Sequence, residues 1–249
     1  KKIIFFITNL PLPYSIIILY DIRKRGTMNM NKNVIITISR QFGSNGREIA
    51  RKLAEYLDIS YYNKEIMEKI AQDMGVCADF FKDQNQDANG LFTIESKGIL
   101  GLRNIAELSV NTQFYDLASE FIEGISKRED AVIVGRCADY ILKENPDVIR
   151  VFCYSDIEER IKWSIEEYKV PAKQAQKIVQ EKDTQRARFY EFYTNQKWGN
   201  PKNYTLMINT SKMTTEETVH LLASLYDVKK GISSFKNAFT DQYEKNNKV

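Results

Sequence analysis

Two glycines, Gly43 and Gly46, separate a strand-like run from a helix-like pattern and could bind phosphate. The run from Val34 to Ile38 is apolar and typical of a strand buried on both faces, whereas apolar residues recur at helical spacing from Ile49 to Leu57. Glycine permits positive φ, so backbone N–H groups can converge beside the N-terminus of the helix. The sequence therefore predicts that the loop binds phosphate through Gly43, Ser44, Asn45 and Gly46. The alternative is an ordinary glycine turn of an α/β fold.

The loop departs from the phosphate-loop pattern GxxxxGK[ST]. If Gly46 is the second glycine, Arg47 and Glu48 stand where Lys and Ser/Thr would fall. A guanidinium can bind phosphate oxygens in bidentate fashion, whereas a carboxylate adds negative charge where a hydroxyl would ligate magnesium. Arg40, Arg47 and Glu48 are included in the predicted donor-phosphate site, and Arg47 is also a candidate catalytic residue.

The composition excludes several kinds of active site. The single histidine, His220, lies in a predicted helix with a capping box of Thr214 and Glu217, which favours a surface position. A Ser/His/Asp hydrolase and a His-rich metal site are therefore poorly supported, and we predict no metal site built from protein ligands. Phosphoryl transfer instead needs positive charge and positioning.

Charge and cysteine content favour a soluble protein of the cytoplasm. The chain of 249 residues has 43% hydrophobic and 28% charged residues, and its net charge of +3 does not by itself indicate a nucleic-acid partner. Its three cysteines, Cys77, Cys137 and Cys153, have no metal-type spacing and are expected to be reduced thiols.

Strands and helices alternate along the chain, which predicts a parallel sheet covered by helices on both faces. The expected strands after the first are residues 60–62, 131–134, 148–154 and 204–209. A helix around residues 66–70 and an insertion at 76–102 precede a strong amphipathic helix over 114–125, and Ser155 and Glu158 are expected to cap the helix after residue 154. Ligands in such folds bind at the carboxyl ends of the strands.

That rule predicts one crevice formed by the residues that follow each strand. They are residues 40–48, Asn63, Lys64, residues 136–139 and Ser155. Arg136 directly follows a buried strand and is expected to point into the crevice, although it could instead pair with Asp139 at the start of a helix.

Residues 171–201, called the lid segment below, interleave basic and aromatic side chains. Such a segment can bind single-stranded nucleic acid, or it can close over transferred phosphates. A third possibility is a helix with a solvated basic face and a buried aromatic face, which we expect for the aromatic residues. Arg186 and Arg188 are two positions apart and cannot share a helical stripe, so each should have a different partner.

The chain is expected to have three parts. Residues 1–29 are an N-terminal extension, which is either a mis-assigned start or a membrane anchor; residues 30–228 form the main domain; and residues 229–249 are a polar tail. A membrane partner is expected only if the extension is a true anchor.

Several motifs, taken in order, resemble the cytidylate kinase-like family of P-loop proteins. They are ITISRQFGSNGREIARKLAEYL, SYYNKEI, AVIVGRCADYIL, VIRVFCYSDIEERI and RARFYEFYTNQKWGNPKNYTLMINTS, and together they run from about Asn33 to about Tyr226. The resemblance implies a three-layer α/β/α P-loop NTPase fold with a mostly parallel sheet, a helical lid and an insertion that binds the nucleoside monophosphate.

The resemblance also implies an activity, namely transfer of the γ-phosphoryl group of ATP, with Mg²⁺, to CMP or dCMP. Arg136 matches the arginine that holds the acceptor phosphate, and Arg186 and Arg188 match the lid arginines. Asp183 is implied to orient the lid or the hydration shell of magnesium.

Asn63, Lys64 and Asp139 are the other residues implied to bind the acceptor. The chain departs from the family pattern at Cys137 and Asn63, where classical enzymes carry aspartate. A regulator that binds nucleotide without turnover, and a nucleic-acid-binding module that uses residues 182–198, therefore stay open as alternatives. The sequence does not indicate an oligomeric state.

Overall fold

The computed structural model describes residues 32–66 and 105–231. Residues 33–223 form one compact unit, which contains all the strands, and residues 224–231 belong to a second unit. The predicted extension, the helix beyond residue 66, the insertion, Cys77 and most of the polar tail lie outside the described residues.

The described strands form a single five-stranded sheet in the order β2-β3-β1-β4-β5. Every neighbouring pair is parallel, which confirms the predicted α/β class. The strands are β1 (Ile35–Arg40), β2 (Ser60–Tyr62), β3 (Ala131–Val134), β4 (Val148–Tyr154) and β5 (Leu206–Asn209), so the last begins two residues later than predicted. The central strand β1 places Ile36 beside Val132 on one side and Ile149 on the other.

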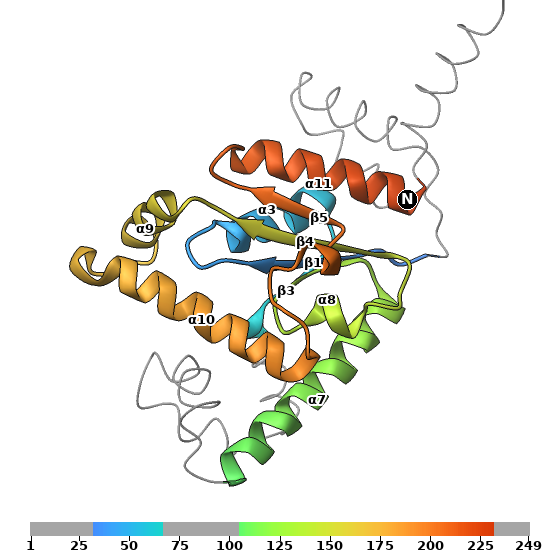
Figure 1. Ribbon diagram of the computed structural model, residues 1–249. Helices are drawn as coiled ribbons and strands as arrows, with labels where there is room; N and C mark the ends of the chain where they lie inside the picture. Colours follow the sequence, from blue (N-terminus) through green and yellow to red (C-terminus); the bar gives the residue numbers. More distant parts are fainter. Residues whose placement is uncertain (1–31, 67–104, 232–249) are drawn as a thin grey trace, which may run out of the picture. The chain divides into compact units, whose positions relative to one another are not determined.

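Helices cover both faces of the sheet, which gives three layers (Figure 1). The helices are α3 (Gly46–Leu57), α7 (Ile105–Arg128), α8 (Ala138–Ile141), α9 (Ile157–Glu166), α10 (Ala175–Thr194) and α11 (Thr215–Lys230), with short 3₁₀ turns at Ala172–Gln174 and Pro201–Asn203. Figure 1 shows α3 on one side of the sheet and α7, α8 and α10 on the other. Among the described residues, no helix has the length and apolar character needed to cross a membrane.

The core lies between the sheet and these helices. On the side of α7 and α8, Ile35 and Ile133 from the strands pack with Ile122 and Ile125 from α7, all fully buried. Helix α3 packs against β1 and β3 and buries Ile49 and Leu53. These contacts fix the ends of β1 and β3 relative to the start of α3, next to the predicted phosphate loop (residues 43–46).

One of the two predicted N-terminal capping boxes is present in the structure and the other is not. The capping box of Thr214 and Glu217 is confirmed. The backbone N–H of Thr214 donates to the Glu217 carboxylate at 2.8 Å, and the backbone N–H of Glu217 donates to Thr214 Oγ1 at 3.2 Å. The predicted box of Ser155 and Glu158 is wrong. Helix α9 begins at Ile157 without a side-chain cap, since the Ser155 hydroxyl bonds instead to that of Ser211 at 2.8 Å, beyond the end of β5.

The single histidine has the surface position that the sequence predicts. His220 is exposed on α11, and its ring meets the Tyr56 ring edge-on at 5.2 Å between centroids. It lines neither of the two cavities described below.

Candidate functional site

A large cavity of about 650 Å³ opens at the carboxyl ends of the strands. Its lining includes Arg40, Gly43, Gly46 and Arg47 from the predicted phosphate loop, together with Asn63–Glu65 beyond β2. Val134, residues 168–171 and α10 residues between Ile178 and Arg186 complete it. Six of its lining residues are cationic, namely Arg40, Arg47, Lys64, Lys169, Lys182 and Arg186, and two are acidic, Glu65 and Glu181. That excess of positive charge suits a polyphosphate ligand.

A smaller cavity of about 70 Å³ adjoins the large one. Arg136, Phe189, Tyr190 and Trp198 are among its lining residues. The two cavities share four lining residues, Arg40, Lys64, Val134 and Arg186. The structure thus brings Arg136 and Arg186 to the same end of the sheet as the glycine loop, as the sequence predicts.

Both loop glycines are required by geometry. Gly43 has φ +77°, and a Cβ there would lie 2.4 Å from the carbonyl oxygen of Arg160. A Cβ on Gly46 would lie 2.7 Å from the Cβ of Arg40. Any side chain at either position would force the loop to move.

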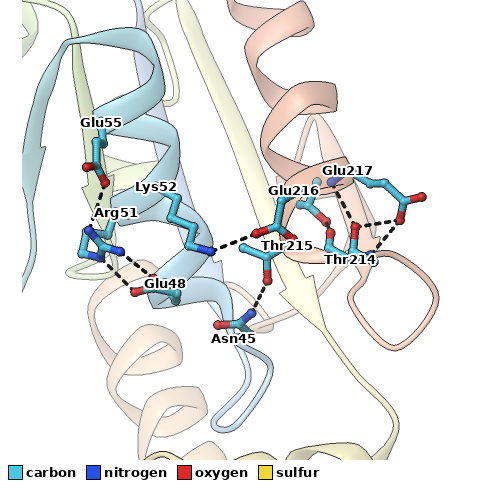
Figure 2. A network of polar contacts seen from close by, with 10 residues as sticks. Asn45, Glu48, Arg51, Lys52, Glu55, Thr214, Thr215, Glu216 and Glu217 are labelled. Atoms are coloured by element: carbon cyan, nitrogen blue, oxygen red, sulfur yellow. Dashed lines mark hydrogen bonds and ion pairs between the residues drawn. The ribbon is translucent and has the colours of Figure 1, made fainter.

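Ser44 and Asn45 hold the loop to the rest of the molecule. Ser44 is buried, and its hydroxyl donates to the carbonyl oxygen of Gln41 at 2.9 Å, so that hydroxyl does not face the large cavity. Asn45 precedes α3 in the left-handed conformation (φ 59°), and its Nδ2 donates to Thr215 Oγ1 at 2.7 Å (Figure 2). The loop is therefore anchored to the start of α11.

Glu48 lies outside the site that the sequence assigned to it. Its carboxylate accepts hydrogen bonds from Arg51 at 2.7 and 2.9 Å along α3, and it does not line the large cavity (Figure 2). The bond from Arg51 lowers the pKa of Glu48 below its usual range. The carboxylate is thus engaged along the helix, because Arg51 lies three positions further on the same face.

Three other predicted residues do line the large cavity. The Arg47 guanidinium forms an ion pair with Glu65 at 3.2 Å. Asn63 is buried, and its Oδ1 accepts a hydrogen bond from the backbone N–H of Ile66 at 2.9 Å. Lys64 lines both cavities. The segment that follows β2 therefore contributes to the site.

The lid segment is mostly the continuous helix α10, and two of its side chains hold the phosphate loop. Asp183 Oδ1 accepts a hydrogen bond from the backbone N–H of Phe42 at 2.7 Å, and its Oδ2 pairs with Arg160. Arg186 Nη1 donates to the carbonyl oxygen of Arg40 at 2.9 Å, and its guanidinium carbon lies 5.4 Å from the centre of the Phe42 ring. Arg188 is exposed and lines neither cavity.

Asp139 lies behind the small cavity and does not line it. It is 1% exposed and accepts hydrogen bonds from Ser39 Oγ at 3.3 Å and Tyr190 OH at 2.8 Å. Burial raises the pKa of Asp139 above its usual range, since the charged form is poorly solvated there. Its two hydrogen bonds position Ser39 and Tyr190, both of which line that cavity.

The aromatic residues of the lid segment do not form one buried face, so that expectation is wrong. Tyr190 is buried, but Phe192 is 47% exposed. Phe189 and Trp198 line the small cavity beside Arg136, whose guanidinium carbon lies 5.9 Å from the Phe189 ring centre. The reason is that α10 follows the edge of the cavities, so its aromatic side chains are divided among core, cavity and solvent.

Sequence reasoning missed three features of the site. Arg160 is 7% exposed and lies between the loop and α10, and Gly135 lies against the Arg40 guanidinium. Tyr168 packs on Phe42 with 5.1 Å between ring centroids. The only available signal was Gly135 directly after an apolar run. Within the described ranges, no cluster of three or more His, Cys, Asp or Glu residues could hold a metal ion.

A model of the cytidylate kinase-like family matches residues 35–212 of the sequence. The chain belongs to this family. Membership in this family supports nucleotide kinase activity, and kinases of this kind generally use ATP with Mg²⁺. The match covers every strand of the sheet and both cavities.

Solved structures resemble this cytidylate kinase-like protein to different degrees. An uncharacterized protein from Eubacterium ventriosum is 26% identical, with a TM-score of 0.60 over 78% of this chain and 99% of that one. Shikimate kinases from Acinetobacter baumannii, in complex with shikimate, and from Bacteroides thetaiotaomicron are each 13% identical with TM-scores of 0.44. They cover 78% and 77% of this chain and 93% and 97% of their own. No curated protein matches the chain.

Proposed function

We propose that this protein transfers the γ-phosphoryl group of ATP to the phosphate of CMP or dCMP. One observation carries the proposal: two adjoining cavities share three cationic residues, Arg40, Lys64 and Arg186. A reaction between two anionic substrates needs positive charge at the point where they meet, because the transition state spreads negative charge over the transferred group.

The large cavity is assigned to the donor nucleotide. Gly43, Asn45, Gly46 and Arg47 of the loop line it, and the positive φ of Gly43 and Asn45 together with the N-terminus of α3 suit a loop that binds phosphate through backbone N–H groups. ATP would bring Mg²⁺ with its phosphates, and magnesium supplies charge neutralisation between the β- and γ-phosphates when bound. Arg47, from the first turn of α3, is assigned to the same phosphates.

The small cavity is assigned to the phosphate end of the acceptor. Arg136 is fixed there by the end of β3 and can hold the acceptor phosphate, with Lys64 and Asn63 at the neighbouring strand end. The rings of Phe189 and Trp198 provide apolar surface beside it. Asp139 acts as a positioning residue through Ser39 and Tyr190.

The reaction needs no side chain to act as a base. An ionised oxygen of the acceptor phosphate forms a bond to the γ-phosphorus, while the bond to the bridging oxygen of ADP breaks. The products are ADP and a nucleoside diphosphate. Arg186 can neutralise the transferred group, and Asp183 holds the loop and α10 together. Arg188 has no assigned contact in this scheme because it is exposed.

A panel of nucleoside monophosphates, each with ATP and Mg²⁺, tests the proposal through ADP formation. We expect turnover with CMP or dCMP above that with AMP, GMP and UMP. ATP binding without turnover on any acceptor would favour a regulator. Binding of oligonucleotides that weakens strongly with salt, without turnover, would favour a nucleic-acid module.

A further inference from the structure

The helix start places the phosphate-loop pattern one residue earlier than the sequence alone indicates. In GxxxxGK[ST] the second glycine directly precedes the lysine at the start of the helix. Here Asn45 has the left-handed conformation that glycine favours, and α3 begins at Gly46. The first position of the pattern is then Arg40, five residues before Asn45, and the lysine position is Gly46.

We propose that Arg40 replaces the missing lysine and binds the β- and γ-phosphates of the donor from the first position of the loop. This inference rests on the proposed function, whose donor site it completes. It also explains why glycine occupies the lysine position, because the side chain of Arg40 fills the space that a residue there would use.

The packing around Gly46 supports this exchange of positions. A Cβ on Gly46 would lie 2.7 Å from the Cβ of Arg40, 3.3 Å from its Cγ, and 3.0 Å from the Cβ of Cys153. The first two contacts are to the Cβ and Cγ of Arg40, so a side chain on residue 46 would collide with the aliphatic part of Arg40. Arginine at the first position therefore requires glycine at the helix start.

The direction of the Arg40 side chain supports a role at the junction of the two cavities. Its Nη1 would lie 2.5 Å from a Cβ on Gly135, at the end of β3, so the guanidinium extends from the end of β1 across to β3. Arg40 lines both cavities. A guanidinium there can reach phosphate groups on either side, as the lysine of an ordinary loop reaches the β- and γ-phosphates.

Arg47 is the competing candidate, and its surroundings favour Arg40. The Arg47 side chain is 48% exposed, is paired with Glu65 at 3.2 Å, and lines the large cavity but not the small one. The Arg40 side chain is instead half-buried, and its guanidinium lies against Gly135, so its position is more restricted. A fixed guanidinium loses less side-chain entropy on binding phosphate.

The test measures the affinity of the whole protein for inorganic tripolyphosphate and for ADP by calorimetric titration. We expect Arg40→Gln to weaken both by about tenfold or more, the value of one charge-assisted hydrogen bond. Arg51→Gln, which removes the same charge from α3 outside both cavities, should bind like the wild type. Circular dichroism of each variant checks that it folds.

A position swap makes the test independent of simple charge loss. Gly46→Lys should fail to bind while Arg40 is present, and the double variant Arg40→Gly with Gly46→Lys should regain at least part of the affinity that Arg40→Gly loses. Wild-type affinity in folded Arg40→Gln, or a larger loss in Arg47→Gln than in Arg40→Gln, would overturn the proposal. These probes need neither an acceptor nor turnover. If the nucleoside monophosphate panel showed no activity, the binding measurements on the Arg40 variants would still test this inference on their own.

Discussion

Three consecutive residues after β3 adopt left-handed backbone conformations: Gly135 (φ 75°), Arg136 (φ 56°) and Cys137 (φ 56°). For a residue other than glycine this conformation costs about 1–2 kcal/mol. Such strain persists only where the surrounding structure enforces it, and it is concentrated at functional sites. Here it turns the chain sharply at the strand end and places Arg136 at the wall of the small cavity.

Replacing Arg136 by alanine should impair use of the acceptor. We expect the KM for the acceptor monophosphate to rise by about tenfold to a hundredfold, which corresponds to one or two lost charge-assisted hydrogen bonds. The KM for ATP and the midpoint of urea unfolding should change little. Steady-state kinetics with each substrate varied in turn provides the measurement. An unchanged acceptor KM would remove Arg136 from the acceptor site.

Asp139 should make stability depend on pH in a defined direction. Its pKa in the folded protein is raised by burial above the ordinary value of 3.8, so the folded state favours the protonated form. The stabilisation is fully present below the unfolded pKa and is lost as pH rises through the folded pKa. Relative to Asp139→Asn, which stays neutral, the wild type should therefore become less stable as pH increases. Urea unfolding of both proteins across acidic to neutral pH measures this difference, and parallel curves would contradict it.

At the scale of elements, Asp183 joins α10 to the predicted phosphate loop through a hydrogen bond and to α9 through an ion pair with the buried Arg160. The side chains of Asp183 and Arg160 are 16% and 9% exposed, and Asp183 also accepts the bond from Phe42 N. Removing one partner leaves the other charge buried without its counter-ion, which is far costlier than losing an exposed pair. The pair therefore links the stability of the lid helix to the shape of the loop.

Asp183→Ala should lower the free energy of unfolding by about 3 kcal/mol and reduce ADP formation. Lys177→Ala is the matched control on the same helix. Lys177 is 79% exposed and pairs with Glu181 at 3.7 Å, so its loss should cost less than about 0.5 kcal/mol. Chemical denaturation gives both values. Equal effects for the two variants would show that the buried pair contributes no more than a surface one.

Two glycine-to-alanine substitutions should change the free energy of unfolding in opposite directions. Gly43→Ala would place a Cβ 2.4 Å from the carbonyl oxygen of Arg160 at positive φ, so we expect a loss of about 2 kcal/mol or more and weaker phosphate binding. Gly124 lies inside α7, and a Cβ there would meet nothing within 4 Å. Gly124→Ala should therefore stabilise the protein by about 0.5–1 kcal/mol. Thermal unfolding distinguishes the two, and destabilisation by both would contradict the role of space at Gly43.

At the scale of the whole molecule, local pattern predicted the elements but not how they meet. The apolar runs of β1, β3 and β4 were sufficient to predict a parallel sheet, and the strand ends to predict a shared crevice. Ser155 was assigned to the wrong partner because Ser211, 56 positions away, competes for its hydroxyl. The phosphate-loop pattern was placed one residue too late, with Gly46 as its second glycine, because a sequence does not show that Asn45 takes the left-handed conformation.

The candidate site joins residues that are far apart in the chain, which is why only its outline could be predicted. Arg40 comes from the end of β1, Lys64 from beyond β2, and Arg186 from α10, and all three line both cavities. The position of Arg186 depends on the full length of chain between β4 and β5. Helical spacing alone did not distinguish it from Arg188, which is exposed.

That difference leads to a prediction about turnover. Arg186→Ala should lower kcat by about a hundredfold, the loss seen when one group that stabilises transition-state charge is removed. Its effect on ATP affinity should be smaller, because the remaining cations of the large cavity still hold the donor phosphates. Arg188→Ala should cost less than Arg186→Ala, since Arg188 lines neither cavity. Single-turnover kinetics together with ATP titration separates the two effects. If ATP affinity fell as much as kcat, Arg186 would be a general phosphate ligand, and equal losses for the two arginines would restore the sequence prediction that both act in the lid.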